Sequence, residues 1–366
     1  MTNIRPRAGV LRIRPHMLVE EESNTKNIEI NIASNESAYG ASPAAISAGI
    51  NAMHDIERYS EMAPDILARE IAAHFDLKAD GVVCGFGSDD ILARIARAYL
   101  SAGDELIYSV NGYQKIPNYA YVNDAEAVAA SDRNFTVDVD AILNCVTDSS
   151  RMVMIANPDN PTASYISGKE VRRLHAELPD NVLLVLDSAY LEYVDADDYE
   201  SPIRLIEEMD NVVMTRTFSK IFGLAGIRLG WSYAPKAIAD ILRRVGITFP
   251  VSSPALNSGL AALKDTEHTA YVYLETRRVR CWFANMLSEH NVIVHPSQTN
   301  FLLTTFPDPL RTAQMAYDYL RENGIVARRF PSPNFSDCIR FTIGLEKEMS
   351  RTADVLNTFF GNVGKN

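Results

Sequence analysis

A lysine that follows a buried strand is the feature that most constrains this chain. Residues 211–214 form an apolar run that predicts a strand, and Lys220 lies just past its end. In an open α/β sheet, ligands bind at the carboxyl ends of the strands. Burial and the nearby cation Arg228 would both disfavour the ammonium form of Lys220. We therefore expect a neutral amine, which can form a Schiff base with an aldehyde.

Hydroxyl and guanidinium groups flank this lysine in the sequence. Thr217, Ser219 and Arg228 are the kinds of donor that bind a phosphate monoester. An aldehyde that carries a phosphate is a description of pyridoxal 5'-phosphate (PLP). A Ser-Lys pair after a strand is more often a solvated loop, so the pair alone does not establish this chemistry.

The longer segment is more specific than the pair. Residues 219–230 read Ser-Lys-Ile-Phe-Gly-Leu-Ala-Gly-Ile-Arg-Leu-Gly. They resemble the cofactor-lysine segment of fold-type I PLP enzymes, and most closely that of the histidinol-phosphate aminotransferase family. Further segments match this family in the same order along nearly the whole chain. The resemblance implies an α/β protein of the PLP-dependent transferase fold type I. Its large domain would have a mainly parallel central sheet flanked by helices, and a small α+β domain would follow.

An acidic residue at a second strand end is expected to hold the cofactor ring. Residues 182–186 predict a strand buried on both faces, and Asp187 at its end needs a partner. By resemblance, Asp187 pairs with the pyridine nitrogen and keeps the ring an electron sink. Tyr190 resembles the tyrosine that bonds the ring oxygen. Asp187, Tyr190 and Lys220 are therefore the expected catalytic residues.

Two further strand ends carry candidate ring contacts. Asn160 lies in the run Asn-Pro-Asp-Asn-Pro-Thr after a predicted strand at 151–156, and Tyr113 follows one at 104–109. A turn explains the first run in any protein, and core packing explains the tyrosine. By resemblance, Asn160 donates to the ring hydroxyl and Tyr113 stacks on the ring.

A glycine-rich turn predicts part of a phosphate site. Residues 85–90 read Gly-Phe-Gly-Ser-Asp-Asp and open a predicted helix, where free N–H groups attract an anion. Serine and aspartate are also ordinary helix caps. The match to the Gly-x-Gly-Ser-Asp cradle of the family makes Gly87, Ser88 and Asp89 candidates for cofactor binding.

Substrate and subunit contacts rest on the resemblance alone. Arg340, on a predicted strand at 338–344, resembles the arginine that forks onto the substrate α-carboxylate, although a solvated arginine is the simpler interpretation. Asn35 and Arg328 match substrate-binding neighbours, and Asn300 is a further such position. Tyr59 resembles a tyrosine that reaches the PLP phosphate of the neighbouring subunit, which implies a homodimer with shared active sites. Departures from the family pattern fall at Ser37, Ala38 and Ala163.

Three divisions of the chain are expected. Residues 1–30 are interpreted as an N-terminal arm over another domain or subunit, 31–253 as the large PLP-binding domain and 254–366 as the small C-terminal domain. The boundary falls where Pro-Val-Ser-Ser-Pro at 250–254 interrupts the pattern.

Charge and cysteine content exclude several classes of protein. A net charge of -12 argues against a nucleic-acid surface, and four scattered cysteines suggest neither a zinc site nor disulfides, so no metal is expected. No continuous apolar core follows the N-terminal arginines, so we expect no membrane partner and a cytoplasmic protein.

The expected function is a PLP-dependent aminotransferase (transaminase) of amino-acid biosynthesis. The family implies histidinol phosphate as amino donor and 2-oxoglutarate as acceptor. An aromatic amino acid aminotransferase and a threonine-phosphate decarboxylase share this scaffold and remain alternatives. A PLP-sensing regulator without turnover is the alternative from another class, but no spare segment for a DNA-binding extension is apparent.

Overall fold

A seven-stranded sheet forms the centre of the larger lobe in this computed structural model, which describes residues 4–13, 28–60 and 65–362. Its strand order is β2-β10-β9-β8-β7-β3-β4. The strands are β2 (Val82–Gly85), β3 (Glu105–Ser109), β4 (Glu126–Ala130), β7 (Ser150–Ala156), β8 (Leu183–Asp187), β9 (Val212–Thr217) and β10 (Gly230–Tyr233). Only β10 runs antiparallel to its neighbours. The expected α/β class with a mainly parallel sheet is therefore confirmed.

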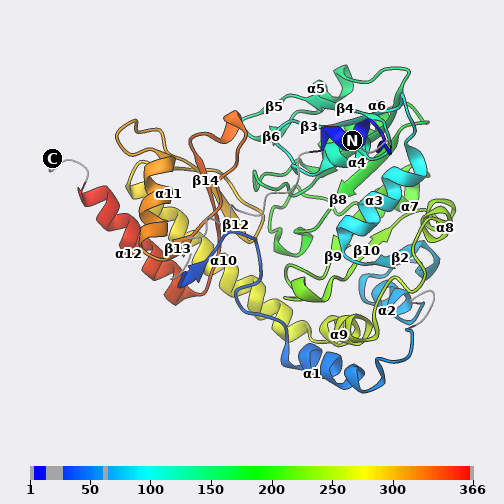
Figure 1. Ribbon diagram of the computed structural model, residues 1–366, viewed down its shortest axis with the longest axis horizontal. Coiled ribbons are helices and arrows are strands. Elements are labelled where there is room, and N and C mark those ends of the chain that lie inside the picture. Colours follow the sequence, from blue (N-terminus) through cyan, green and yellow to red (C-terminus); the bar gives the residue numbers. More distant parts are fainter. Residues whose placement is uncertain (1–3, 14–27, 61–64, 363–366) are drawn as a thin grey trace.

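Continuous apolar runs explain why the central strands are buried on both faces. In β8 every residue is buried, and its alternate side chains enter two different cores. Leu183 and Val185 face α3 (Ser88–Tyr99), α4 (Ile116–Tyr121) and α8 (Lys236–Arg244). Leu184 and Leu186 face α2 (Asp65–Phe75), α6 (Gly168–Glu177), α7 (Ile203–Glu208) and α9 (Ser253–Lys264). The sheet is thus covered by helices on both sides (Figure 1).

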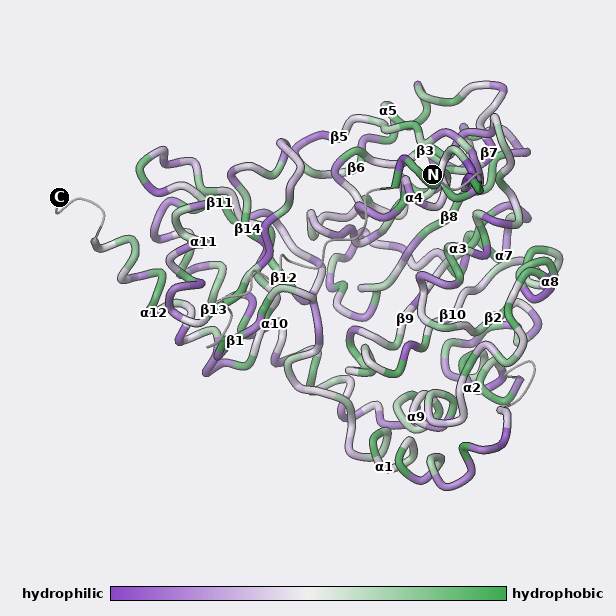
Figure 2. Tube along the Cα trace, in the orientation of Figure 1, coloured by the Kyte–Doolittle hydropathy of each residue, from purple (hydrophilic) through white to green (hydrophobic). Residues whose placement is uncertain are grey.

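Helix α9 continues the core of the large lobe past the predicted boundary at 253. Its buried residues Ala255, Leu256 and Leu263 belong to the same core as β8, and it packs against α1 (Pro43–Asn51) and α2. Hydrophobic stretches are visible on α1 and α9 (Figure 2). The division into domains at 253 stays a prediction.

The smaller lobe is an α+β layer with a core of its own. Strands β11 (Ile293–Val294), β12 (Phe301–Thr305) and β14 (Cys338–Thr342) form an antiparallel sheet, and β1 (Ile30–Asn31) pairs in parallel with β13 (Ile325–Val326). Helices α10 (Thr266–Glu289), α11 (Ala313–Glu322) and α12 (Glu346–Asn362) pack on these strands. In Figure 1, α10 extends from the end of α9 into this lobe. The chain therefore contributes to the smaller lobe from both ends.

Shorter elements complete the described chain. Strands β5 (Asp132–Arg133) and β6 (Thr136–Val137) form a hairpin before α5 (Val139–Asn144). The single-turn helices are η1 (Gly9–Arg12), η2 (Ala52–Asp55), η3 (Ala79–Gly81), η4 (Leu191–Tyr193), η5 (Ala225–Ile227) and η6 (Pro333–Phe335). Within the described ranges, no helix is long and apolar enough to cross a membrane.

Residues 4–13 of the predicted arm lie on the large lobe of their own chain, whereas Ile30 pairs with Ile325 in the smaller lobe. Arg7 donates to the carbonyl of Val122 at 3.0 Å, and the backbone N–H of Gly9 donates to Asp124 at 2.8 Å. Arg12 pairs with Glu126 at 2.8 Å. Residues 1–3 and 14–27 of the arm lie outside the described residues.

Candidate active site

The predicted site residues gather at one edge of the large sheet. Parallel strands β2, β3, β7, β8 and β9 all end there, and the antiparallel β10 begins there. A chain that leaves each of these strands must place its next residues at this edge. The sequence therefore brings together Gly87, Tyr113, Asn160, Asp187 and Lys220, each of which ends one of the five strands or follows it within four residues.

Lys220 points toward the junction of the two lobes. Its Nζ donates to the carbonyls of Asn35 at 3.1 Å and Ser34 at 3.5 Å, and it lies 5.7 Å from the centre of the Tyr190 ring. Burial lowers the pKa of Lys220 to about 8, and the charges of Arg340 and Arg228 act in the same direction. Burial and a nearby cation, the two expected causes of a lowered pKa at Lys220, are therefore both present.

Asp187 is a buried carboxyl at the end of β8. Its Oδ1 accepts a hydrogen bond from the hydroxyl of Thr215, on the neighbouring strand, at 2.9 Å. Burial raises the pKa of Asp187 to about 7, and the charge of Asp89 adds to the rise, while Lys220 opposes it. A cation placed against this carboxyl would return it to its charged form.

Asn35 joins the catalytic candidates to the smaller lobe. Its backbone is left-handed, with φ +57°, and its carbonyl accepts from Lys220 and, at 3.2 Å, from Asn300. Its side-chain amide donates to the hydroxyl of Tyr190 at 3.0 Å, and its carboxamide oxygen accepts from Thr342 on β14 at 3.0 Å. Tyr190 is itself fully buried, so Asn35 fixes the one polar atom of that ring.

Arg340 is buried, so the simpler interpretation of a solvated arginine is wrong. Only 5% of its surface is exposed, and its guanidinium donates to the carbonyl of Ala33 at 2.5 Å and to the side-chain oxygen of Asn160. Arg340 pairs across the backbone with Arg328. Substrate-lobe and cofactor-lobe candidates therefore meet directly, through Arg340 and Asn160.

The glycine-rich turn packs against Arg228. Gly87 has φ +83°, and a Cβ added there would lie 2.6 Å from Nη2 of Arg228. A Cβ on Gly230 would lie 2.3 Å from the backbone nitrogen of Ser88. Gly87 is restricted to glycine by its positive φ, and Gly230 is restricted because a Cβ there would collide with the backbone at the start of α3.

The remaining cradle candidates contact this turn or one another. Arg228 has a left-handed backbone, with φ +57°, and directly precedes the short run that leads into β10 at Gly230. Its Nη1 donates to the hydroxyl of Ser219 at 3.3 Å, and the backbone N–H of Ser219 donates to Thr217 Oγ1 at 3.0 Å. One cluster of hydroxyls, a guanidinium and a helix start results.

Tyr113 is held by Asp89 rather than by packing alone. The tyrosine hydroxyl donates to Asp89 at 3.1 Å, and the same carboxylate accepts from Tyr119 at 2.8 Å and Lys115 at 2.9 Å. Burial alone would raise the pKa of Asp89, but its hydrogen bond to Lys115 and the charge of Lys115 bring that pKa below its ordinary value. The side chain of Asp89 thus orients Tyr113.

Of the remaining predicted residues, Tyr59 lies apart from the site in the single chain and Arg328 lies next to Arg340. Tyr59 is 82% exposed and stacks on Phe249, with ring centres 4.3 Å apart. Arg328 reaches the site through its backbone pairing with Arg340, and its guanidinium lies 5.8 Å from the ring of Phe330.

The departure at Ala163 keeps the backbone that glycine would favour. Ala163 has φ +63° and is fully buried. The left-handed turn after Asn160 is therefore preserved without glycine, at the steric cost that a Cβ brings to this conformation.

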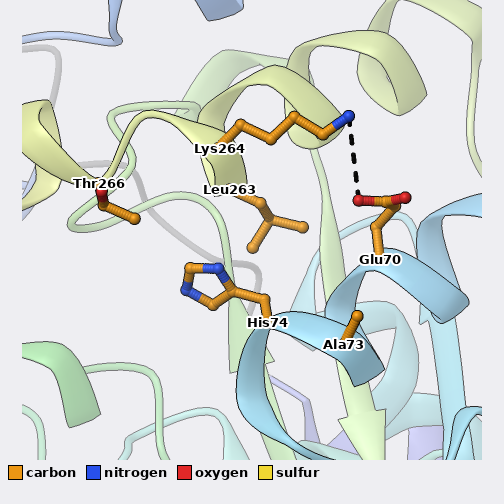
Figure 3. Close-up of a pocket in the computed structure, with 6 residues that line it drawn as sticks. All are labelled: Glu70, Ala73, His74, Leu263, Lys264 and Thr266. Carbon is orange, nitrogen blue, oxygen red and sulfur yellow. Dashed lines mark ion pairs between the residues drawn. The ribbon is translucent and has the colours of Figure 1, made fainter.

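A separate hollow lies between α2 and α9, away from the strand ends. It is lined by Glu70, Ala73, His74, Leu263, Lys264 and Thr266 and has a volume of about 330 Å³. Glu70 and Lys264 form an ion pair of 3.9 Å across it (Figure 3). None of the predicted site residues lines this hollow.

Sequence reasoning missed Lys115, Tyr119, Thr215 and the buried acid Asp159. Thr215 directly follows the predicted strand at 211–214. Because β9 in fact extends to residue 217, a longer predicted strand would have placed Thr215 beside Asp187. Lys115 and Tyr119 carry no local signal, because only the packing of α4 against α3 brings them to Asp89.

The residues present fit PLP. Asp187 is a buried carboxyl with a raised pKa, which suits a partner for the ring nitrogen. Lys220 is an amine with a lowered pKa, which suits a bond to the aldehyde. The turn at Gly87 lies against the guanidinium of Arg228, which suits an anion such as the phosphate. The fold and the site define the class of PLP-dependent aminotransferases of fold type I.

Comparison with known proteins gives the family. The pattern of the family described as "Aminotransferase class I and II" matches residues 27–356, and the chain belongs to this family. It is 42% identical to a histidinol-phosphate aminotransferase of Rhodospirillum centenum, over 96% of this chain and 97% of that one. A relative of the same description from Maricaulis maris is 40% identical, over 97% and 99% of the two chains.

Solved structures agree with this assignment. The crystal structure of a histidinol-phosphate aminotransferase from Sinorhizobium meliloti, in complex with pyridoxal-5'-phosphate, superposes with a TM-score of 0.92. It is 26% identical and covers 100% of this chain and 99% of that chain. The predicted family, cofactor and enzyme class are therefore confirmed: the protein is a PLP-dependent transaminase that acts on an amino compound and a keto acid.

Proposed function

We propose that this enzyme transfers an amino group from histidinol phosphate to 2-oxoglutarate. The relatives named above support the donor. The observation that carries the proposal is a pair of adjacent arginines, Arg328 and Arg340, whose charges no carboxylate of the described residues neutralises. Such a pair suits a phosphate monoester better than a neutral substrate side chain.

The two arginines face one apolar wall of the site. Arg328 lies 5.8 Å and Arg340 lies 5.4 Å from the ring centre of Phe330. Burial lowers the pKa of Arg340 to about 10, and the charge of Arg328 acts in the same direction. The Nε of Arg340 has no hydrogen-bond partner among the described residues. A dianion would relieve the repulsion between the arginines and occupy the unused donor.

The proposed roles of the remaining residues follow from their positions. Bound PLP supplies the electron sink that stabilises negative charge at the substrate Cα. Lys220 would hold the cofactor and, once displaced by the substrate amine, move the proton between the substrate Cα and the C4′ carbon of the cofactor. Its carbonyl partners on Asn35 and Ser34 hold Nζ at the junction of the lobes.

Asp187 would hold the pyridine nitrogen, and Tyr190 and Asn160 the ring oxygen. Thr215 fixes the carboxylate of Asp187, and Asn35 fixes the hydroxyl of Tyr190. Gly87, Ser88, Thr217, Ser219 and Arg228 would bind the cofactor phosphate. With glutamate or 2-oxoglutarate in the site, Arg340 would pair with the α-carboxylate.

We also propose a homodimer with shared sites. Ile46, Ile50 and Met53 follow one another at helical spacing along α1 and η2, each more than half exposed, and they lead to Ile56 and Tyr59. A second copy of the chain would cover this apolar face and bring its Tyr59 to the cofactor phosphate. The cytoplasmic location stays a prediction.

Single-turnover reactions test the donor. The enzyme is mixed separately with histidinol phosphate, glutamate, phenylalanine and threonine phosphate, and conversion to pyridoxamine phosphate is followed by absorbance. We expect rapid conversion with histidinol phosphate and glutamate. Faster conversion with phenylalanine would indicate an aromatic aminotransferase, and release of carbon dioxide from threonine phosphate would indicate a decarboxylase.

Substitution of Arg328 tests the phosphate contact. Arg328→Gln should lower kcat/KM for histidinol phosphate by about ten- to a hundredfold, the value of one charge-assisted hydrogen bond, and should change the glutamate reaction less than threefold. Arg329→Gln is the matched control, since Arg329 donates to the carbonyl of Cys338 instead. Equal losses with both donors would contradict a phosphate contact at Arg328.

A further inference from the structure

Two carboxylates follow the phosphate cradle in the first turn of α3. Asp89 and Asp90 come directly after Ser88, at the helix end where free N–H groups favour one anion. A phosphate bound at the same helix start would be repelled by both carboxylates unless their charges are balanced. The structure balances each of them separately.

Asp90 is balanced from within its own helix. The buried guanidinium of Arg94, one turn further on, donates to both oxygens of Asp90, one of these bonds measuring 3.0 Å. The backbone N–H of Phe86 also donates to Asp90, at 2.9 Å. This carboxylate therefore closes the glycine turn that precedes the helix.

Asp89 is balanced from a different element. Its one cationic partner among the described residues is Lys115, at 2.9 Å, which directly precedes α4. Two tyrosine hydroxyls, of Tyr119 at 2.8 Å and Tyr113 at 3.1 Å, donate to the same carboxylate. Lys115 also lies 5.8 Å from the centre of the Tyr119 ring, which helps to fix its position.

On the other side of the turn, Arg228 keeps its charge available. Its guanidinium lies against Gly87 and donates to the neutral oxygens of Ser219 and Ala225, at 3.3 and 2.9 Å. No carboxylate of the described chain forms an ion pair with it. Arg228 is thus a cation without a carboxylate partner among the described residues, whereas Asp90 is paired with Arg94 and Asp89 with Lys115.

We infer that Lys115 is a positioning residue that neutralises Asp89, so that this carboxylate can orient Tyr113 without repelling the cofactor phosphate. The inference rests on the proposed placement of the phosphate at Gly87, Ser88 and Arg228. Loss of the Lys115 charge would leave one uncompensated negative charge beside a dianion. If Lys115 only held the local structure, its loss would weaken the binding of the cofactor ring and of the phosphate alike.

A pair of ligands separates these two effects. PLP and pyridoxal share the ring and the aldehyde, and only PLP carries the phosphate. Their dissociation constants are measured by absorbance titration of the apo-protein. Lys115→Met should weaken PLP binding by about tenfold and pyridoxal binding by less than about twofold, because Coulomb repulsion acts only on the phosphate.

Three further variants complete the test. Lys115→Arg should restore the ratio of the two constants, and so should the double variant Lys115→Met/Asp89→Asn, which removes the uncompensated charge. Lys236→Met is the matched control, because Lys236 forms an ion pair of 2.6 Å with Asp240 on the surface helix α8. Equal weakening of PLP and pyridoxal, or no weakening, in Lys115→Met would overturn the role of Lys115.

The placement of the phosphate has a separate test. Arg228→Gln should weaken PLP far more than pyridoxal. If it leaves the ratio of the two constants unchanged, the phosphate lies elsewhere, and both the placement and the inference fail. A normal effect of Arg228→Gln together with an unchanged ratio in Lys115→Met overturns the inference alone.

Discussion

Asp159 is a buried carboxyl that no cation of the described residues neutralises. Its Oδ2 accepts from the hydroxyl of Thr162 at 2.9 Å, whereas Oδ1 has no partner in the described chain. Burial raises the pKa of Asp159 to about 7, against the opposing hydrogen bond from Thr162, and the charges of Asp132 and Asp187 add to the rise. Below about pH 7 the folded protein therefore favours the protonated acid.

The sign of the resulting pH dependence follows from proton linkage. Between about pH 4 and pH 7 the unfolded chain has released this proton, but the folded chain retains it, so stability falls as the pH rises. Asp159→Asn removes the penalty. It should raise the free energy of unfolding of the apo-protein at both pH values, by about 1 to 3 kcal/mol more at pH 8 than at pH 5.

Urea denaturation of the apo-protein at both pH values measures this difference. Asp210→Asn is a control at an exposed carboxylate and should leave both curves unchanged. An effect of Asp159→Asn that is the same at pH 5 and pH 8 would show that the acid is not protonated in the folded chain.

At the scale of elements, the strands of the large sheet were predictable because strands buried on both faces have continuous apolar sequences. The run at 182–186 became β8, and Asp187 stands at its end as predicted. Helix α9 was missed, because Pro-Val-Ser-Ser-Pro was interpreted as a break. Ser252, which caps the helix, and Pro254 in its first turn were in fact start signals.

Contacts between distant elements could not be predicted in the same way. Arg340 follows the alternation of a strand, yet its burial depends on Asn160 and Ala33, far away in the sequence. Lys115 and Asp89 are separated by a helix and a strand before they meet. Resemblance to a family identified candidate residues that lie in short local motifs. The side chains that contact them are brought close only by tertiary packing, so they could not be predicted from those motifs.

At the scale of the whole molecule, the exposed Tyr59 makes the proposed dimer testable. Lys220→Ala and Tyr59→Ala should each be inactive alone. When the two variants are mixed and allowed to exchange subunits, one dimer in two is mixed, and one of its two sites is intact. We expect about a quarter of the parental activity.

A second mixture controls for non-specific rescue. Lys220→Ala mixed with Asp187→Ala should recover nothing, because both residues belong to the same chain's site and every site lacks one of them. Recovery in neither mixture would mean that each chain builds its site alone and that Tyr59 does not cross to a partner.

The residues at this sheet edge surround Lys220, whose proposed role is to bind the cofactor covalently. Detection of that bond is the most direct test of the proposed active site. Holoenzyme is reduced with borohydride, digested and analysed by mass spectrometry. We predict the reduced cofactor on the peptide that contains Lys220 and its absence in Lys220→Ala. Attachment at a different lysine in the parental protein, or retention of the reducible bond in Lys220→Ala, would contradict this account.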